Sequence, residues 1–180
     1  MTGAYDKAVE HCRKSIELCP LYARSFNTLG IALKELGSYA GALESYQRAI
    51  EIDPSFEATS NNLALLLESL EISAFSQQIA DCYLHVLGKK MAAKPIGLAP
   101  RIISLLKHFS SFQTILHNNE QTSFTEDLVE VCLVLSEIPL FLKLIELSVI
   151  PDLEIEKLLK RVRKTILLNV NRNIIDERLT

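Results

Sequence analysis

The chain repeats its own pattern at an interval of 34 residues. Pro20 and Pro54 stand at this interval, and chemically similar residues surround both of them. The other matched pairs are Gly3 with Gly37, Tyr5 with Tyr39, Ala8 with Ala42, Cys12 with Tyr46, Leu18 with Ile52, Tyr22 with Phe56, Asn27 with Asn61, Leu29 with Leu63 and Gly30 with Ala64. A fixed interval of this size is typical of helical units that stack in a row, because one unit cannot bury its apolar face alone. The chain is therefore predicted to begin with a short solenoid of helices.

Small and aromatic residues take complementary places in the unit from Ala23 to Pro54. Gly30 and Ala42 are small at the points where the two helices of a hairpin are expected to cross. Tyr39 and Tyr46 are expected to fill the space that these small residues leave, because protein interiors are close-packed.

Turn-forming residues predict where the helices end. Gly37 can adopt the left-handed conformation that often ends a helix, and Pro54 cannot continue one. The expected helices are Gly3–Cys19, Ala23–Leu36, Tyr39–Ile52, Glu57–Glu71 and, with a pattern that has drifted, Ile72–Val86.

The unit from Ala23 to Pro54 resembles the tetratricopeptide (TPR) repeat. The resemblance is carried by Phe26, Leu29, Gly30, Gly37, Tyr39, Ala42, Tyr46, Ala49 and Pro54. It implies stacked antiparallel helix pairs, with a TPR array of about two and a half repeats over residues 1–87. The first helix of the first repeat is missing, so the sequence is interpreted as a fragment of a longer protein or a truncated reading frame. Its absence is expected to leave three apolar side chains uncovered: Ala8, Cys12 and Ile16.

Beyond residue 87 the interval is lost, but helical patterns continue. Residues 88–100 hold two prolines and two glycines and are predicted to be a linker. Residues 101–180 are predicted to be an irregular helical extension. Its expected parts are a helix from Pro100 to about Phe112, a polar turn at His117–Gln121, a helix opened by a capping box of Ser123 and Glu126 and ending near Ser136, a helix Pro139–Leu147, and a last helix from Pro151 to about Arg172. No alternating strand pattern occurs, so the predicted fold is all-α.

No residue pattern indicates catalysis, a metal or a cofactor. There is no glycine-rich phosphate loop and no serine nucleophile motif. The histidines have no metal-binding spacing: His11, His85, His108 and His117. The cysteines match no zinc pattern and are expected to be buried, reduced thiols of a cytoplasmic protein: Cys12, Cys19, Cys82 and Cys132.

Charge and hydropathy limit the partners. The net charge of −3 does not favour nucleic acid, whose binders usually carry a basic footprint.

Charged residues interrupt the apolar stretch Asp127–Ile150, so a buried helical pair is expected there and no membrane span. Because Leu128–Ile150 is too apolar for its neighbours to cover, self-association through the C-terminal helices is predicted. A basic face on the last helix fits phosphate or an acidic partner, although a solvated face is the more common cause: Lys157, Lys160, Arg161 and Lys164.

The TPR resemblance implies a groove lined by the first helix of each pair, which holds a protein or peptide partner. The positions left for the partner are Arg24, Asn27, Ile31, Lys34, Asn61, Leu65 and Glu68, with Ala58 beside them. Asn27 and Asn61 lie one repeat apart, and an amide side chain both donates and accepts hydrogen bonds, which suits the backbone of an extended peptide.

Two functions follow from these observations. The first is a protein–protein interaction scaffold without catalytic activity of its own. The alternative is the substrate-recruiting front of a larger S-adenosylmethionine-dependent methyltransferase, or of a TPR glycosyltransferase, with the catalytic domain beyond Thr180. The stretch Leu147–Leu168 weakly resembles the connector in bacterial TPR–methyltransferase fusions.

Overall fold

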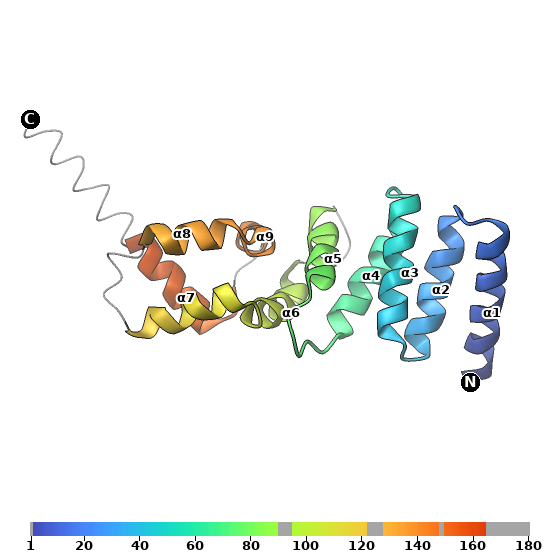
Figure 1. Cartoon of the computed structure of the whole chain (residues 1–180), viewed down its shortest axis with the longest axis horizontal. Helices are drawn as coiled ribbons and strands as arrows, with labels where there is room; N and C mark the ends of the chain where they lie inside the picture. The colour runs from blue at the N-terminus through green and yellow to red at the C-terminus, as the bar shows by residue number, and fades with distance from the viewer. Residues whose placement is uncertain (1, 90–94, 122–127, 148–149, 165–180) are drawn as a thin grey trace, which may run out of the picture.

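The computed structural model describes residues 2–89, 95–121, 128–147 and 150–164. Within these ranges every regular element is a helix: α1 (Thr2–Leu18), α2 (Ala23–Glu35), α3 (Tyr39–Ile52), α4 (Glu57–Ser69), α5 (Gln77–Gly88), α6 (Pro95–Lys107), α7 (Ser110–Gln121), α8 (Leu128–Ser136), α9 (Pro139–Leu147) and a further helix over residues 153–164. Helices α1 to α5 follow one another along the long axis of the molecule, and α6 to α9 occupy the other end (Figure 1). The prediction of an all-α fold with TPR hairpins and a helical extension is confirmed.

The turn between α2 and α3 has the geometry that the sequence predicts. Gly37 has a φ of 76°, which is the left-handed region. The N–H of Ser38 donates to the carbonyl of Leu33 at 2.8 Å, and the N–H of Gly37 donates to the carbonyl of Lys34 at 2.9 Å. These two bonds form a Schellman motif, which satisfies carbonyl groups that the end of α2 would otherwise leave unpaired.

The crossing of α2 and α3 is built on Gly30 and Tyr46. Tyr46 is 1% exposed, and a Cβ atom at position 30 would come within 2.5 Å of its ring. Ala42 is fully buried beside this contact. The prediction for Tyr39 is wrong, since this side chain is 48% exposed. Tyr39 is the first residue of α3 and therefore lies beyond the crossing point.

The partner helix of α4 begins later than predicted. Instead of a helix from Ile72, residues 70–76 form a connection and α5 begins at Gln77. The position one repeat after Gly37 is Glu71, whose Cβ disfavours the left-handed turn that closes the first hairpin. The side chain of Ser76 then caps α5 by accepting a hydrogen bond from the N–H of Ile79.

Helix α6 begins inside the predicted linker. Pro95 is its first residue, a position that suits proline, while Pro100, which was expected to begin the helix, lies within it. The helix also ends at Lys107 and does not reach Phe112. The chain turns at residues 108–109 and continues as α7, so that Phe112 packs against Phe141 of α9 with 5.3 Å between the ring centroids.

Two other expectations for the second half of the chain have opposite outcomes. The expected polar turn at His117–Gln121 is wrong, because α7 continues helically to Gln121. The helix Pro139–Leu147 is confirmed with both ends as predicted. The capping box of Ser123 and Glu126 lies outside the described residues, as does the expected end near Arg172.

The core runs without interruption from Ala42 in α3 to Val162 in the last described helix, across the predicted boundary at residues 88–100. A smaller cluster joins α1 to α2, and in it Cys12 is 8% exposed. The expectation that Cys12 lacks cover is therefore wrong, because α2 supplies Leu29 and Ala32 to the same cluster. Ala8 and Ile16 are half-buried against this cluster.

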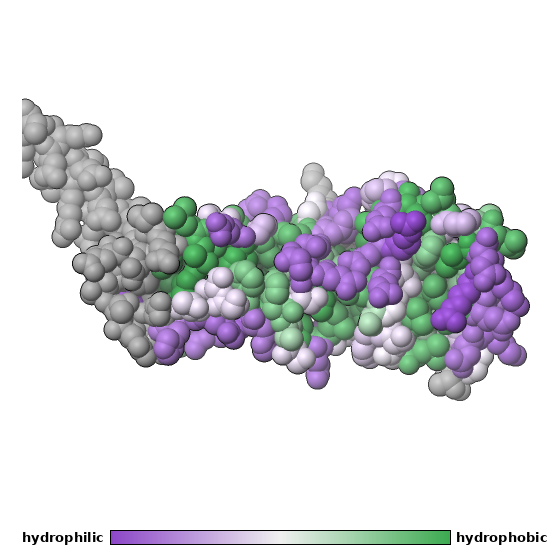
Figure 2. Space-filling view, viewed as in Figure 1, coloured by the Kyte–Doolittle hydropathy of each residue, from purple (hydrophilic) through white to green (hydrophobic). Residues whose placement is uncertain are grey.

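Apolar side chains remain exposed at the C-terminal end of the molecule. Figure 2 shows apolar surface over α8, where Leu133 is 58% exposed. Other exposed members are Leu142, Ile145 and Leu147 of α9. Self-association through these helices stays a prediction.

Candidate partner-binding wall

Helices α2 and α4 carry exposed apolar residues at equivalent positions of the repeat. Ile31 of α2 and Leu65 of α4 are 34 residues apart, and both are exposed, at 36% and 57%. Because α2 and α4 are the first helices of successive repeats, we expect these two side chains to lie in line. We call this surface the α2–α4 wall and define it by Arg24, Ile31, Lys34, Ala58, Asn61, Leu65 and Glu68.

Charged groups border the apolar line. Lys34 is half-buried and lies 3.3 Å from the carboxylate of Glu35. Arg24 is exposed, and its guanidinium stands 5.7 Å from the centre of the Phe56 ring. This cation–π contact places a positive charge at the edge of the wall.

Asn27 is not available to a partner in the way that its spacing suggested. It is 7% exposed, and its Oδ1 accepts a hydrogen bond of 3.0 Å from Nδ2 of Asn62. The contact joins α2 to α4, so Asn27 contributes to packing between repeats. Asn61 is half-buried and remains part of the wall. Sequence reasoning missed the role of Asn62, because the interval of 34 pairs Asn27 with Asn61, whereas the contact in space is made one residue later.

Glu68 lies at the far edge of the wall. It is half-buried, and one of its carboxylate oxygens would be 3.1 Å from a Cβ atom at Gly97. Glycine at this position of α6 thus leaves room for the carboxylate between α4 and α6. The wall ends where α6 packs, while Leu65 remains open to solvent.

One serine–histidine contact lies outside the wall. Ser60 Oγ and His85 Nε2 are 3.0 Å apart, and burial, followed by the charge of Lys89, lowers the pKa of His85. Ser60 is only 3% exposed, so the hydroxyl is closed to a substrate. The contact ties α4 to α5.

The remaining chemistry of the described residues is sparse. Across these ranges no group of three His, Cys, Asp or Glu side chains is placed to hold a metal ion. Of the four cysteines, which are all unpaired, Cys12 and Cys82 are buried, as the prediction of buried thiols requires, whereas Cys132 is only partly buried. Cys19 is exposed, contrary to prediction, because it lies just after the end of α1. None of the described helices combines the length and the apolar character needed to cross a bilayer.

Residues 30–70 match the sequence model of the TPR repeat family. This segment begins at Gly30, contains the whole of α3 and α4, and includes both Ile31 and Leu65. A comparison with curated proteins gave no match. The family match agrees with the 34-residue interval, the Schellman turn at Gly37 and the packing of Gly30 on Tyr46. Residues 30–70 therefore carry the tetratricopeptide repeat.

Proposed function

We propose that this chain is a protein-interaction module that holds an apolar segment of a partner on the α2–α4 wall. The observation that carries the proposal is the exposure of Ile31 and Leu65 at equivalent places in successive repeats. TPR repeats generally mediate protein–protein interaction, which supports a protein or peptide as the partner.

The chemistry of the wall suggests the form of the partner. Two apolar side chains in line favour a segment that offers two apolar groups at a matching spacing. Arg24 at one edge favours an acidic group beside them. A binding surface of the size of the α2–α4 wall is expected to hold such a segment with a Kd in the micromolar range, which is a binding free energy of about −8 kcal/mol.

Selection of peptides from a displayed random library on the purified chain tests the proposal. We expect the selected peptides to share paired apolar residues and to lose roughly tenfold or more in affinity for the Ile31→Lys, Leu65→Lys double variant. Leu18→Lys, Leu21→Lys is the matched control, because both side chains are exposed, at 84% and 76%, and both lie outside the wall. Peptides that bind the double variant as tightly as the unaltered chain would show that the wall is not the binding surface.

A further inference from the structure

A second surface lies at the other end of the molecule from the α2–α4 wall. A cleft of about 720 Å³ opens between the end of α6, helix α7 and the helix of residues 153–164. Most of the side chains that line it are basic: Lys107, His117, Lys157, Lys160 and Arg161. Glu154 is the one acidic residue among its described lining residues, and Leu116 contributes an apolar patch.

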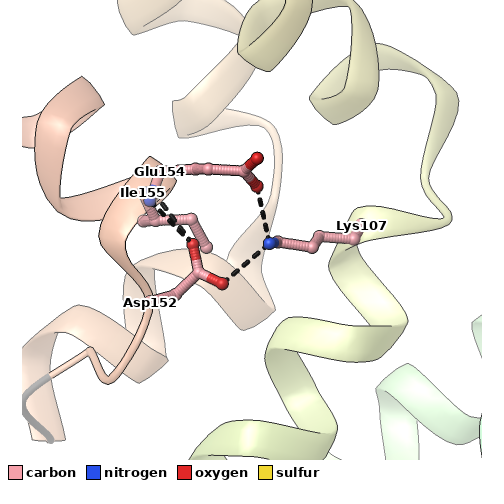
Figure 3. A network of polar contacts seen from close by, with 4 residues as sticks. All are labelled: Lys107, Asp152, Glu154 and Ile155. Atoms are coloured by element: carbon pink, nitrogen blue, oxygen red, sulfur yellow. Dashed lines mark hydrogen bonds and ion pairs between the residues drawn. The ribbon is translucent and has the colours of Figure 1, made fainter.

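A network of polar contacts centred on Lys107 holds the helix of residues 153–164 in place beside this cleft (Figure 3). Nζ of Lys107 lies 2.7 Å from Oδ2 of Asp152 and 2.7 Å from Oε2 of Glu154. The other oxygen of Asp152 accepts hydrogen bonds from the N–H groups of Glu154 and Ile155, both at 3.1 Å. Asp152 is thus the N-cap of this helix. The ion pairs of Lys107 with Asp152 and Glu154 orient the helix.

The positive charge that faces the cleft comes from the helix itself. Residues 153–164 hold five Lys or Arg side chains and two Glu side chains, in a chain whose net charge is −3. Lys160 has only a loose contact of 3.6 Å with Glu156, and its side chain is 74% exposed. Lys157 is exposed and takes part in none of the ion pairs that the described residues form.

The spacing of these cations indicates the shape of the ligand. Lys157, Lys160 and Arg161 follow one another at helical intervals along the lining of the cleft, so their backbone positions extend over roughly 6 Å. Carboxylates carried at successive positions of a peptide can pair with cations placed at such intervals. No aromatic ring is found among the lining residues that the structure describes, which removes the stacking that single-stranded nucleic acid relies on.

We propose that this cleft is a second partner site, which binds an acidic peptide segment with its carboxylates on Lys157, Lys160 and Arg161 and an apolar side chain on Leu116. The site is independent of the α2–α4 wall, and its chemistry is different. A chain that joins an apolar wall to a basic cleft would hold two partners, or two segments of one partner, at opposite ends of the molecule.

Fluorescence anisotropy with a labelled peptide of alternating glutamate and leucine tests the site on the full chain. We expect the Lys157→Glu, Lys160→Glu variant to lose roughly tenfold or more in affinity. The matched control is Lys7→Glu, Arg13→Glu, which makes the same change of net charge on exposed positions of α1. Circular dichroism establishes that each variant keeps its helices.

Three results would overturn the proposal. Equal losses in the two double variants would mean that the peptide responds to net charge and not to the cleft. No measurable binding of the peptide to the unaltered chain would remove the site. A labelled oligothymidylate that binds more tightly than the peptide, and that the cleft variant releases, would assign the surface to nucleic acid.

Discussion

Gly30 of α2 lies directly against the ring of Tyr46 of α3, and a Cβ atom at position 30 would stand 2.5 Å from Cε1 of that ring. The ring is buried, so it has little room to move. The closest approach of the two helices in this hairpin therefore depends on the absence of a side chain at one position.

Substitution of this glycine is expected to destabilise the fold. Gly30→Ala should lower the free energy of unfolding by about 1–3 kcal/mol, as overpacking in a core usually does. Thermal unfolding followed by circular dichroism measures the change. Gly3→Ala is the control, because nothing lies within 4 Å of a Cβ atom at that position. Equal melting temperatures for Gly30→Ala and the unaltered chain would contradict the tight crossing.

The amide contact between α2 and α4 makes a separate prediction. Asn62→Ala leaves Oδ1 of the buried Asn27 without its hydrogen bond and should cost about 1–3 kcal/mol of stability. Asn27→Leu combined with Asn62→Leu removes both polar groups and should cost less than the single change, because no buried polar atom is left unpaired. Chemical denaturation of the two variants provides the comparison, and the reverse order of stability would refute a direct bond.

Asp152 is expected to make stability depend on pH. Burial alone would raise its pKa, but hydrogen bonds from Lys107 and from the backbone of Ile155 and Glu154 outweigh it, so the pKa is lowered from 3.8. A carboxyl group whose pKa falls on folding stabilises the folded state above its unfolded pKa. This contribution is lost as the pH drops below 3.8 and through the folded value.

Two variants separate the cap from the ion pair. Asp152→Asn retains a good N-cap but loses the charge, whereas Asp152→Ala loses both and should cost about 1 kcal/mol more. The melting temperature of each variant, measured from neutral to acidic pH, is the readout. The difference between the unaltered chain and Asp152→Asn should shrink as the pH falls through the folded pKa. A difference that stays constant with pH would exclude the ion pair with Lys107 as its source.

The cysteines should differ in reactivity. Burial raises the pKa of Cys82 to about 11, and the hydrogen bond from Gln47 only partly offsets this effect. Because the thiolate is the reactive form, Cys82 should react with a thiol reagent only after unfolding. Cys19 is exposed and should react in the native chain. Cys19→Ser should remove the fast phase, and a fast phase that survives this substitution would place the reactive thiol elsewhere.

Local chemistry was enough to predict the first complete hairpin. Gly30, Gly37 and Ala42 act through their own size or backbone freedom, so their roles can be derived from the sequence and agree with the structure. The same holds for α9, whose first residue is a proline. The late start of α5 follows from a local cause too, since Glu71 replaces the glycine that the turn needs, but the sequence alone did not reveal how the chain would respond.

The tertiary structure decided which side chains face solvent and which face each other. Repeat spacing placed Asn27 on the wall with Ile31 and Leu65, but the packing of α2 on α4 buries Asn27 against Asn62 and leaves the two apolar residues exposed. The cleft beside Lys107 likewise combines segments separated by 47 positions in the chain. Periodicity describes one helix or one repeat at a time. Contacts between helices depend on the angle and register at which they pack, and these are set by all the packed side chains together.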